Sequence, residues 1–217
     1  MALNKIKGNM YDFVSHTWNV CKGICSHDCE YCFMKRFKNQ KPLRLDEKEF
    51  KTDLGKDNFI FVGSSTDMFA KDVSKEWIIR VLENCKLYDN EYLFQTKNPK
   101  RFEEFLDHFP KKSVLGITLE SNRDIKNCNA PNPKVRAIEM LKIPFNPMIT
   151  IEPIMDFDLE EFVKIIQELK PKFVNIGADS LGHKLPEPSW TKIQQLIKEL
   201  EKFTKVNLKT NLRRLNK

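Results

Sequence analysis

The chain is 217 residues long, is 41% hydrophobic and carries a formal net charge of +7. This composition excludes a disordered chain, and because no apolar run is long enough to span a membrane, we expect a soluble protein with one sizeable core. The length is too short for two ordinary domains and a linker, which predicts a single domain over residues 1–217. The positive charge fits either a lysine-rich solvated surface or an anionic substrate or partner.

The chain has six cysteines, and the residues at its start indicate which kind of compartment those cysteines are in. No secretory leader is recognisable there, since Lys5 and Lys7 stand among polar residues. We therefore expect a cytoplasmic protein in a reducing compartment, and a disulfide framework is the weakest interpretation of these cysteines.

Short apolar runs of strand type alternate along the chain with segments of helical periodicity. Each expected helix follows a capping residue such as Ser74, and the helix after Asn132 carries its apolar residues at Val135, Ile138 and Leu141. Strands separated by helices imply right-handed crossovers and a parallel sheet, here with six strand–helix units. The expected strands are 12–20, 59–63, 92–96, 114–119, 145–151 and 173–177, with 206–210 as a candidate seventh, and the expected helices begin at 74, 98, 132, 158 and 189.

Polar residues follow nearly every expected strand. In barrels of parallel strands, catalytic groups gather at the carboxyl edge of the sheet. A curved, barrel-like sheet would bring these groups together on one rim, whereas a flat doubly wound sheet would spread them along an edge. The pattern therefore favours a barrel. The groups are the cysteines within 25–32, then Ser64, Ser65, Thr66 and Asp67, Thr96 and Lys97, Glu120, Ser121 and Arg123, Glu152, Asp179, Ser180 and His183, and finally Lys209, Asn211 and Arg213.

The most specific motif is the run Gly23–Phe33, which contains Cys25, Cys29 and Cys32 in the spacing C-x3-C-x2-C. An aromatic residue, Tyr31, stands directly before the last of them. Three thiolates this close can hold three corners of a cubane iron–sulfur cluster, whose full ligation takes four cysteines. Such a loop leaves one iron available to another ligand.

Two alternatives involve Cys21, which precedes Cys25 by the same gap that separates Cys25 from Cys29. A zinc-binding interaction module usually pairs two separated C-x2–4-C knuckles, and a single crowded stretch fits that arrangement poorly. An iron–sulfur electron carrier would use Cys21 as a fourth ligand. Of the other cysteines, Cys85 is expected to be a packed core thiol, and Cys128 is assigned no role.

The cysteine spacing and its aromatic residue resemble the signature of the radical S-adenosylmethionine (SAM) superfamily. The surrounding sequence resembles a branch of that superfamily that is common in phages and prophages, and in outline it is similar to spore photoproduct lyase. The segments that carry this second resemblance are His16–Asn19, Ser65–Phe69, Phe94–Lys97 with Pro99 and Arg101, Gly116–Glu120 and Ile151–Pro153.

This resemblance implies a fold, two cofactors and a reaction. The fold would be a partial (β/α)6 TIM-like barrel with outer helices and the cluster loop after its first strand. Cys25, Cys29 and Cys32 would hold a [4Fe-4S] cluster whose open iron binds the amino and carboxylate groups of SAM. An external one-electron reductant, of the flavodoxin or ferredoxin type, would drive cleavage of SAM to a 5′-deoxyadenosyl radical, which abstracts hydrogen from a substrate. Such an enzyme would be oxygen-sensitive.

The resemblance also implies where SAM binds. Tyr31 matches the aromatic residue that lies against the adenine. The superfamily usually has a Gly-Gly-Glu-like segment after the second strand, and this chain has Gly63-Ser-Ser-Thr-Asp67 in its place. Hydroxyl and carboxylate oxygens there can accept from the SAM ammonium; alternatively, residues 65–67 only shape a turn.

Further SAM contacts are expected at later strand ends. Glu120 or Ser121 would meet the ribose hydroxyls, and Arg123 would pair with the SAM carboxylate unless it is an ordinary surface arginine. Glu152 is a strand-end carboxylate of the kind that barrels use in function. The complete set of candidate SAM-binding residues is Tyr31, Ser64, Ser65, Asp67, Thr96, Lys97, Glu120, Ser121, Arg123 and Glu152.

Basic clusters indicate the substrate class. They occur at 35–38, 97–101, 111–112 and 205–217, and Phe33, Phe37 and Phe102 are interleaved with them. The leading hypothesis is an anionic substrate, a nucleic acid or nucleotide. The alternatives are that the lysines are solvated and the aromatic residues belong to the core, and that the substrate is a peptide or a small metabolite.

Overall fold

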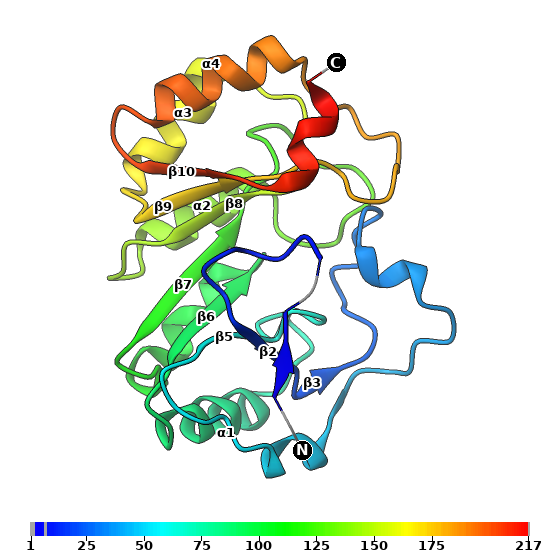
Figure 1. The fold of residues 1–217 in the computed structure, drawn as a ribbon, viewed down its shortest axis with the longest axis vertical. Helices are drawn as coiled ribbons and strands as arrows, with labels where there is room; N and C mark the ends of the chain where they lie inside the picture. The colour runs from blue at the N-terminus through cyan, green and yellow to red at the C-terminus, as the bar shows by residue number, and fades with distance from the viewer. Residues whose placement is uncertain (1–2, 7, 217) are drawn as a thin grey trace.

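In the computed structural model, which describes residues 3–6 and 8–216, the chain forms an eight-stranded sheet in the order β1-β2-β5-β6-β7-β8-β9-β10. From β2 to β10 all neighbouring strands are parallel, and β1 pairs with β2 antiparallel. Figure 1 shows the sheet curving from β2 through β7 to β10. Its strands are β1 (Asn4–Lys5), β2 (His16–Trp18), β5 (Phe59–Val62), β6 (Glu91–Thr96), β7 (Ser113–Thr118), β8 (Met148–Ile151), β9 (Phe173–Ile176) and β10 (Lys205–Leu208).

The helices lie on the outer, convex side of this sheet (Figure 1). The predicted capping residues Ser74, Asn132 and Ser189 each accept a backbone N–H in the first turn of α1, α2 and α4. The predicted partial barrel of parallel strands with outer helices is therefore confirmed, and its candidate seventh strand is β10. The helices are α1 (Lys75–Lys86), α2 (Pro133–Leu141), α3 (Leu159–Glu168) and α4 (Trp190–Leu200), with the 3₁₀ helices η1 (Phe33–Arg36), η2 (Glu47–Lys51), η3 (Pro99–His108) and η4 (Thr210–Leu215).

A small hairpin that the sequence analysis did not predict frames the cysteine loop. Its strands β3 (Cys21–Lys22) and β4 (Arg44–Leu45) pair antiparallel, so residues 23–43 leave and return at one place. Gly23 has φ of 112°, and a Cβ atom there would lie 2.4 Å from the carbonyl oxygen of Pro42. Only glycine allows the two ends of the excursion to approach this closely.

The segment predicted as a helix after Asn98 is the 3₁₀ helix η3, with a kink at Phe105. Three phenylalanine rings from this segment and the residue after it pack around Phe69, with ring centroids 4.8 to 6.1 Å away. These rings are Phe102, Phe105 and Phe109. We attribute the departure from a regular α-helix to this packing.

Helix α2 presents a different face to the core from the one predicted. Val135, Ile138 and Leu141 are 45%, 56% and 50% exposed, while Arg136 is buried on the same face as Met140. The expectation that the apolar stripe of α2 packs inward was wrong. The physical reason is that Arg136 pairs with a buried carboxylate under the helix, and an unpaired buried charge would cost several kcal/mol.

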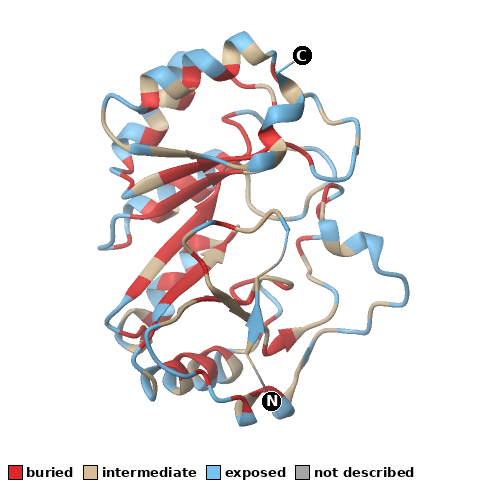
Figure 2. Ribbon diagram, in the orientation of Figure 1, coloured by how far each residue is buried: buried red, intermediate tan, exposed pale blue. Residues whose placement is uncertain are grey.

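Successive residues of each strand point to opposite faces of the sheet. On β8, Ile149 and Ile151 belong to the hydrophobic cluster under the helices, while Met148 belongs to a smaller cluster inside the curve. The N-terminal segment supplies Tyr11 and Val14 to that inner cluster. Figure 2 shows the strands of the sheet as largely buried. The first parallel strand is shorter than the predicted 12–20, and residues before it pack on the inner face.

The inner face changes character along the strands. At the amino ends it is apolar, and toward the carboxyl edge it becomes polar. Leu93, Met148 and Phe173, which contribute to the inner cluster, are followed two residues later by Gln95, Thr150 and Asn175. Because strand residues two apart share a face, these polar groups lie inside the curve, at the edge where the sequence places the chemistry.

The first and last described segments meet. The hydroxyl of Thr210 donates a hydrogen bond to the side-chain oxygen of Asn9 at 3.0 Å. The side-chain nitrogen of Asn9 in turn donates to Glu152, which follows β8. Lys7 and Lys217, the second of which belongs to the predicted basic tail, lie outside the described residues, and so do Met1 and Ala2.

No helix among the described residues is long and apolar enough to cross a membrane.

Candidate functional site

The cysteine loop lies beside the carboxyl edge of the sheet, between β3 and η1. Cys29 is buried, Cys25 and Cys32 are half-buried, and all three are free thiols. Burial raises the pKa of Cys25 to about 12. Cys21, by contrast, lies in the hydrophobic cluster under the helices, as a packed thiol does. In the described part of the chain, no three His, Cys, Asp or Glu side chains are arranged to hold a single metal ion.

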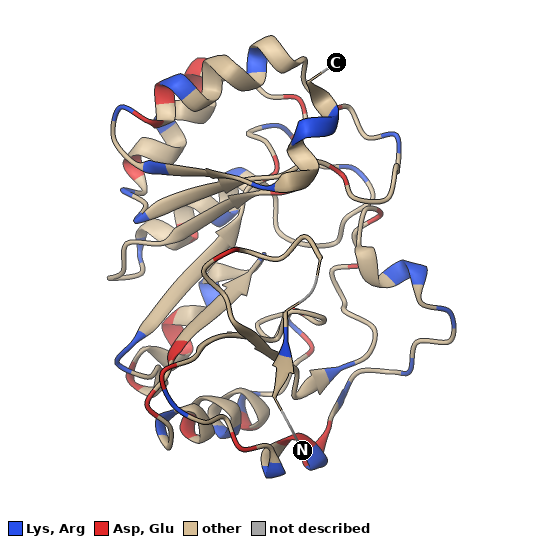
Figure 3. Cartoon of the chain, in the orientation of Figure 1, with Lys and Arg blue, Asp and Glu red and all other residues tan. Residues whose placement is uncertain are grey.

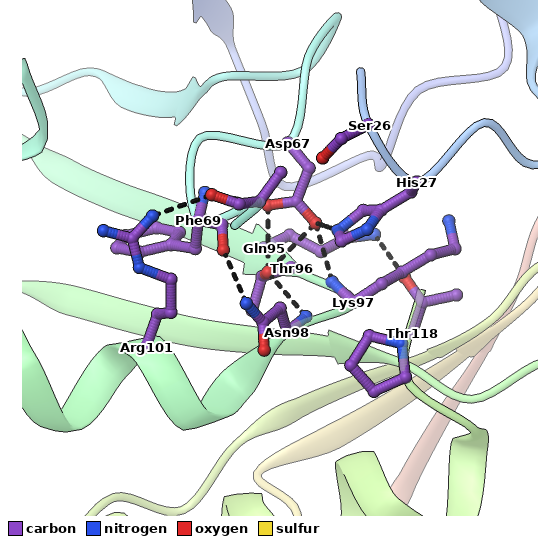
Figure 4. A network of polar contacts seen from close by, with 12 residues as sticks. Ser26, His27, Asp67, Phe69, Gln95, Thr96, Lys97, Asn98, Arg101 and Thr118 are labelled. Carbon is purple, nitrogen blue, oxygen red and sulfur yellow. Dashed lines mark hydrogen bonds and ion pairs between the residues drawn. The ribbon is translucent and has the colours of Figure 1, made fainter. Parts of the chain in front are cut away.

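Asp67 ties the cysteine loop to the ends of two strands (Figure 4). Its carboxylate accepts hydrogen bonds from the Thr96 hydroxyl, at 2.9 Å, and from the backbone N–H groups of Phe69 and Lys97. The Nε2 atom of His27 lies 2.8 Å from Oδ2 and donates to it, because a carboxylate only accepts. Burial alone would raise the pKa of Asp67, but the His27 contact and the other donors hold it below its usual value.

Glu120 forms a second buried network at the end of β7. Its side chain is fully buried and accepts from the Tyr31 hydroxyl and from Arg136, whose Nη1 atom is 2.7 Å from Oε2. Arg136 also donates to the carbonyl of Thr118 at 2.9 Å. Burial, and then the charge of Glu120, raise the pKa of Tyr31. The predicted adenine-facing ring is thus held in place by its own hydroxyl.

Lys97 lies between these two networks. Its Nζ atom is 5.3 Å from the centre of the Tyr31 ring and 3.9 Å from Glu120 Oε1. Burial lowers its pKa, but the neighbouring Cys29 and Glu120 outweigh burial and raise it, so the side chain keeps its charge. A cation beside soft thiol ligands on one loop fits an anionic, thiolate-bound iron–sulfur cluster. The residues present therefore fit the cluster that the sequence implies.

The segment after β5 is organised by Asn19. Its side-chain oxygen accepts from the Ser64 hydroxyl at 3.2 Å and from the Ser65 backbone N–H at 3.0 Å. The Thr66 hydroxyl donates to the carbonyl of Gly23 at 3.0 Å, so this segment also contacts the base of the cysteine loop. Ser64, Ser65 and Asp67 are therefore brought to the cysteine loop, where the sequence analysis placed them.

Ser121 and Arg123 bind neighbouring parts of the protein. The Ser121 hydroxyl donates to the carbonyl of Asp156 at 2.6 Å, and Arg123 pairs with Asp156 and with Asp158, at 2.6 Å from the latter. The hydrogen bond with Asp158 raises the pKa of Arg123. A SAM carboxylate would have to displace two aspartates to reach this arginine, so its expected role stays a prediction.

Glu152 lies on the other side of the rim, among residues from both ends of the chain. Its Oε2 atom is 2.8 Å from Lys209 Nζ, and its Oε1 accepts from Asn9 at 3.0 Å. Gly177, directly after β9, leaves room for this side chain, because a Cβ atom there would lie 2.8 Å from Glu152 Oε1. The Lys209 ammonium also lies 4.4 Å from the centre of the Tyr11 ring.

A distant segment lies on the cysteine loop. The backbone N–H of Glu30 donates to the carbonyl of Asn127 at 2.9 Å, and that of Asn129 donates to His27 at 2.6 Å. Cys128, between them, has its sulfur 2.7 Å from that of Cys29. The thiol–thiol hydrogen bond raises the pKa of Cys29 and lowers that of Cys128.

Sequence reasoning missed three of these residues. Arg136 stands in a helix where periodicity drew attention to its apolar neighbours, and no local signal marks it. Asn19 stands out in the sequence only as the last residue of the segment His16–Asn19. Cys128 was visible as a cysteine in a polar loop, and only the folded chain brings it to Cys29.

The fold and the site define a partial (β/α) barrel with a cysteine-bearing loop at its carboxyl edge. Residues 9–194 match the family described as Protein of unknown function (DUF5131), and the chain belongs to that family. No curated protein matches the chain.

Solved structures of spore photoproduct lyase share the fold. A cysteine-to-serine mutant matches with a TM-score of 0.66 and 12% identity, over 93% of this chain and 79% of that one. A tyrosine-to-phenylalanine mutant matches with a TM-score of 0.64 and 11% identity, over 94% of this chain and 80% of that one. A double mutant with bound AdoMet and dinucleoside spore photoproduct matches with a TM-score of 0.58 and 11% identity, over 93% of this chain and 66% of that one. At this identity the likeness shows the fold alone.

Proposed function

We propose that this chain is a radical SAM enzyme that holds a [4Fe-4S] cluster on Cys25, Cys29 and Cys32. One observation carries the proposal. The three-cysteine loop lies at the carboxyl edge of a partial barrel that shares its fold with spore photoproduct lyase, and one structure of that lyase contains AdoMet. When bound, the cluster and SAM supply a 5′-deoxyadenosyl radical, with the electron coming from an external flavodoxin- or ferredoxin-like reductant.

The residues around the loop position it before any ligand binds. Asp67 holds His27 and the backbone after β6, which fixes the cysteine loop against the rim. Lys97 offsets the negative charge of the three thiolates. Glu120 and Arg136 hold the Tyr31 ring where the adenine is expected. These hydrogen bonds provide the preorganisation that an effective site requires.

The same hydrogen bonds divide the expected SAM-binding residues into those that position the cysteine loop and those that remain preferred contacts for SAM. The Asp67 carboxylate is already occupied by four donors, so we assign it a positioning role. Ser64 and Ser65 remain the preferred contacts for the SAM ammonium, because their hydroxyls lie on the segment that Asn19 brings to the cysteine loop. Thr96 donates to Asp67 and likewise positions the loop.

Anaerobic reconstitution with iron and sulfide, followed by SAM and dithionite, tests the proposal. We expect about four irons per chain and formation of 5′-deoxyadenosine, measured by mass spectrometry. Serine at Cys25, Cys29 or Cys32 removes a ligand and should abolish the product. The variant Cys85→Ala, which removes a thiol from the core under α1, should keep both cluster and product.

Two outcomes would contradict the proposal that the protein is a radical SAM enzyme. One is a fully loaded cluster that forms no 5′-deoxyadenosine. The other is loss of the cluster in Cys21→Ser, which would identify Cys21 as a fourth ligand and the protein as an electron carrier.

We further propose that the substrate is a nucleic acid, bound through a basic and aromatic segment next to the cysteine loop. Phe33 and Phe37, in and after η1, are 42% and 49% exposed. The Arg36 guanidinium lies 4.7 Å from the centre of the Phe37 ring. Figure 3 shows basic residues on this part of the chain. Exposed rings beside cations are the elements that bind unpaired bases and phosphates.

The basic segment 97–101 gives less support to a nucleic acid interface than the segment after Cys32 does. Arg101 is buried and donates to the carbonyls of Ala70 and Val73, and Phe102 is fully buried. The interpretation of the aromatic residues as core is therefore right for Phe102 and wrong for Phe33 and Phe37. The candidate interface is limited to the residues that follow Cys32.

Fluorescence anisotropy with labelled single-stranded DNA and RNA tests this interface. Phe37→Ala should weaken binding by roughly 1–3 kcal/mol, the usual value for one stacked base. Lys142→Ala, on the outer surface after α2, serves as the control and should bind like wild type. Binding that does not weaken as salt rises would contradict a nucleic acid partner.

A further inference from the structure

One pair of sulfur atoms joins parts of the chain that are 99 residues apart. The Sγ atoms of Cys29 and Cys128 are 2.7 Å from each other, and both residues are free thiols. Cys29 is an expected cluster ligand, whereas the proposed enzyme has no use for Cys128. The distance exceeds a covalent sulfur–sulfur bond of about 2.05 Å, so the two thiols are in contact and not bonded.

The backbone holds the two cysteines in this arrangement. The N–H of Glu30 donates to Asn127 at 2.9 Å, and the N–H of Asn129 donates to His27 at 2.6 Å, so the two segments run side by side. The Asn127 side chain also donates to Glu30 at 2.9 Å. Three hydrogen bonds therefore keep the two segments together on either side of the cysteine pair.

Of the two sulfurs, that of Cys128 is the one open to reagents from outside. A pocket of about 170 Å³ lies beside it and is lined by Cys128, Ile125, Asp124 and Arg136 among others. Cys128 is half-buried, while Cys29 is buried behind it. The two remaining thiols outside the loop, Cys21 and Cys85, are buried in the hydrophobic core, where no oxidant approaches them.

We propose that Cys29 and Cys128 form a reversible disulfide in the cluster-free protein. With oxidised glutathione as oxidant, the Cys128 sulfur attacks one sulfur of the glutathione disulfide and releases one glutathione. The Cys29 sulfur then attacks the Cys128 sulfur and releases the second glutathione. Two protein S–H bonds and the glutathione S–S bond break, one protein S–S bond forms, and the two protons end on the two glutathione thiols.

This disulfide has a consequence for cluster loading, and that consequence rests on the proposed function. Cys29 cannot bind iron while its sulfur is bonded to Cys128, because only a thiolate is a ligand. Oxidation would therefore block loading and protect Cys29 from irreversible oxidation, and reduction would restore it. Cys128 is thus a redox partner of the loop rather than a ligand.

Thiol mapping tests the disulfide itself. Chelator-treated protein is incubated with oxidised glutathione, alkylated and digested, and its peptides are identified by mass spectrometry without reduction. We expect a peptide linking Cys29 to Cys128, loss of two of the six thiols, and full recovery with dithiothreitol. A link between Cys29 and Cys32, or six free thiols, would overturn the proposal.

Two variants complete the test. In Cys128→Ser no link to Cys29 can form, while Cys85→Ala should form it as wild type does. Oxidised wild type should take up less than about one quarter of the iron of the reduced protein, because a cluster loop with one ligand missing binds poorly. Cys128→Ser should load equally before and after oxidation. If neither form binds iron, the proposed function fails while the mapped disulfide still stands.

Discussion

The two sides of the rim differ in how their buried polar groups are satisfied. On the side of β5 to β7, Asp67 and Glu120 each accept from several donors, and Arg136 donates from Nη1 to Thr118 and Glu120 and from Nε to Pro131. On the side of β8 to β10, the hydroxyl of Thr150 and the side-chain nitrogen of Asn175 are buried without a hydrogen-bond partner among the described residues. The first side is complete in itself, which suits a place that positions a cofactor.

On the second side Glu152 is well bonded, whereas the Thr150 hydroxyl and the Asn175 side-chain nitrogen are not bonded within the described protein. Buried polar groups are almost always bonded, to protein, water or a ligand, so we expect water or a polar ligand to complete the bonding of Thr150 and Asn175. Mutations on the two sides should therefore separate stability from substrate binding.

The largest effect is expected for Arg136→Met. It leaves Glu120 buried and unpaired, which should lower the free energy of unfolding by roughly 3–5 kcal/mol, the usual result when one partner of a buried pair is removed. Urea unfolding measures the loss. The double variant Glu120→Gln with Arg136→Met should recover much of it. A single variant as stable as wild type would mean that the β5–β7 side is not held by this pair.

A smaller loss is expected for Asp67→Asn, about 2 kcal/mol, because charged hydrogen bonds contribute more than neutral ones. The folded-state pKa of Asp67 is depressed, so its contribution is present above the unfolded value and is lost as pH falls through the folded one. The stability difference between wild type and Asp67→Asn should therefore shrink on acidification. A difference that grows toward acid would contradict this assignment.

The smallest effect on stability is expected on the other side, for Asn175→Leu. It removes a buried nitrogen that has no partner and one bond from Asn207, of 3.2 Å, so the free energy of unfolding should change by less than about 1 kcal/mol. Iron content should stay at the wild-type level, while affinity for the substrate should fall. A loss above about 2 kcal/mol would show that Asn175 is structural and remove the contrast between the two sides.

The features that could be predicted from sequence are those with local signals. The C-x3-C-x2-C spacing, the capping residues Ser74 and Ser189 and the alternation of strands and helices all act within a few residues. The curvature of the sheet was inferred from polar strand ends, and the contact between Tyr31 in the cysteine loop and Glu120 after β7 shows that distant strand ends converge.

The features that could not be predicted depend on partners far along the chain. Arg136 is buried because of Glu120, and the apolar stripe of α2 faces out for the same reason, which no periodicity reveals. Cys128 becomes meaningful only through a pairing of loops 99 residues apart. In both cases an interaction between side chains outweighs the local pattern.

The bond between Thr210 and Asn9 ties the first residues of the chain to the last turn of structure. A chain leaving the ribosome therefore presents Glu152 long before Lys209 and Asn211, which bond to it, have been made. Contacts of such wide sequence separation form late and slow the folding of the whole. Nascent chains should consequently depend on chaperones until residues 209–211 have emerged.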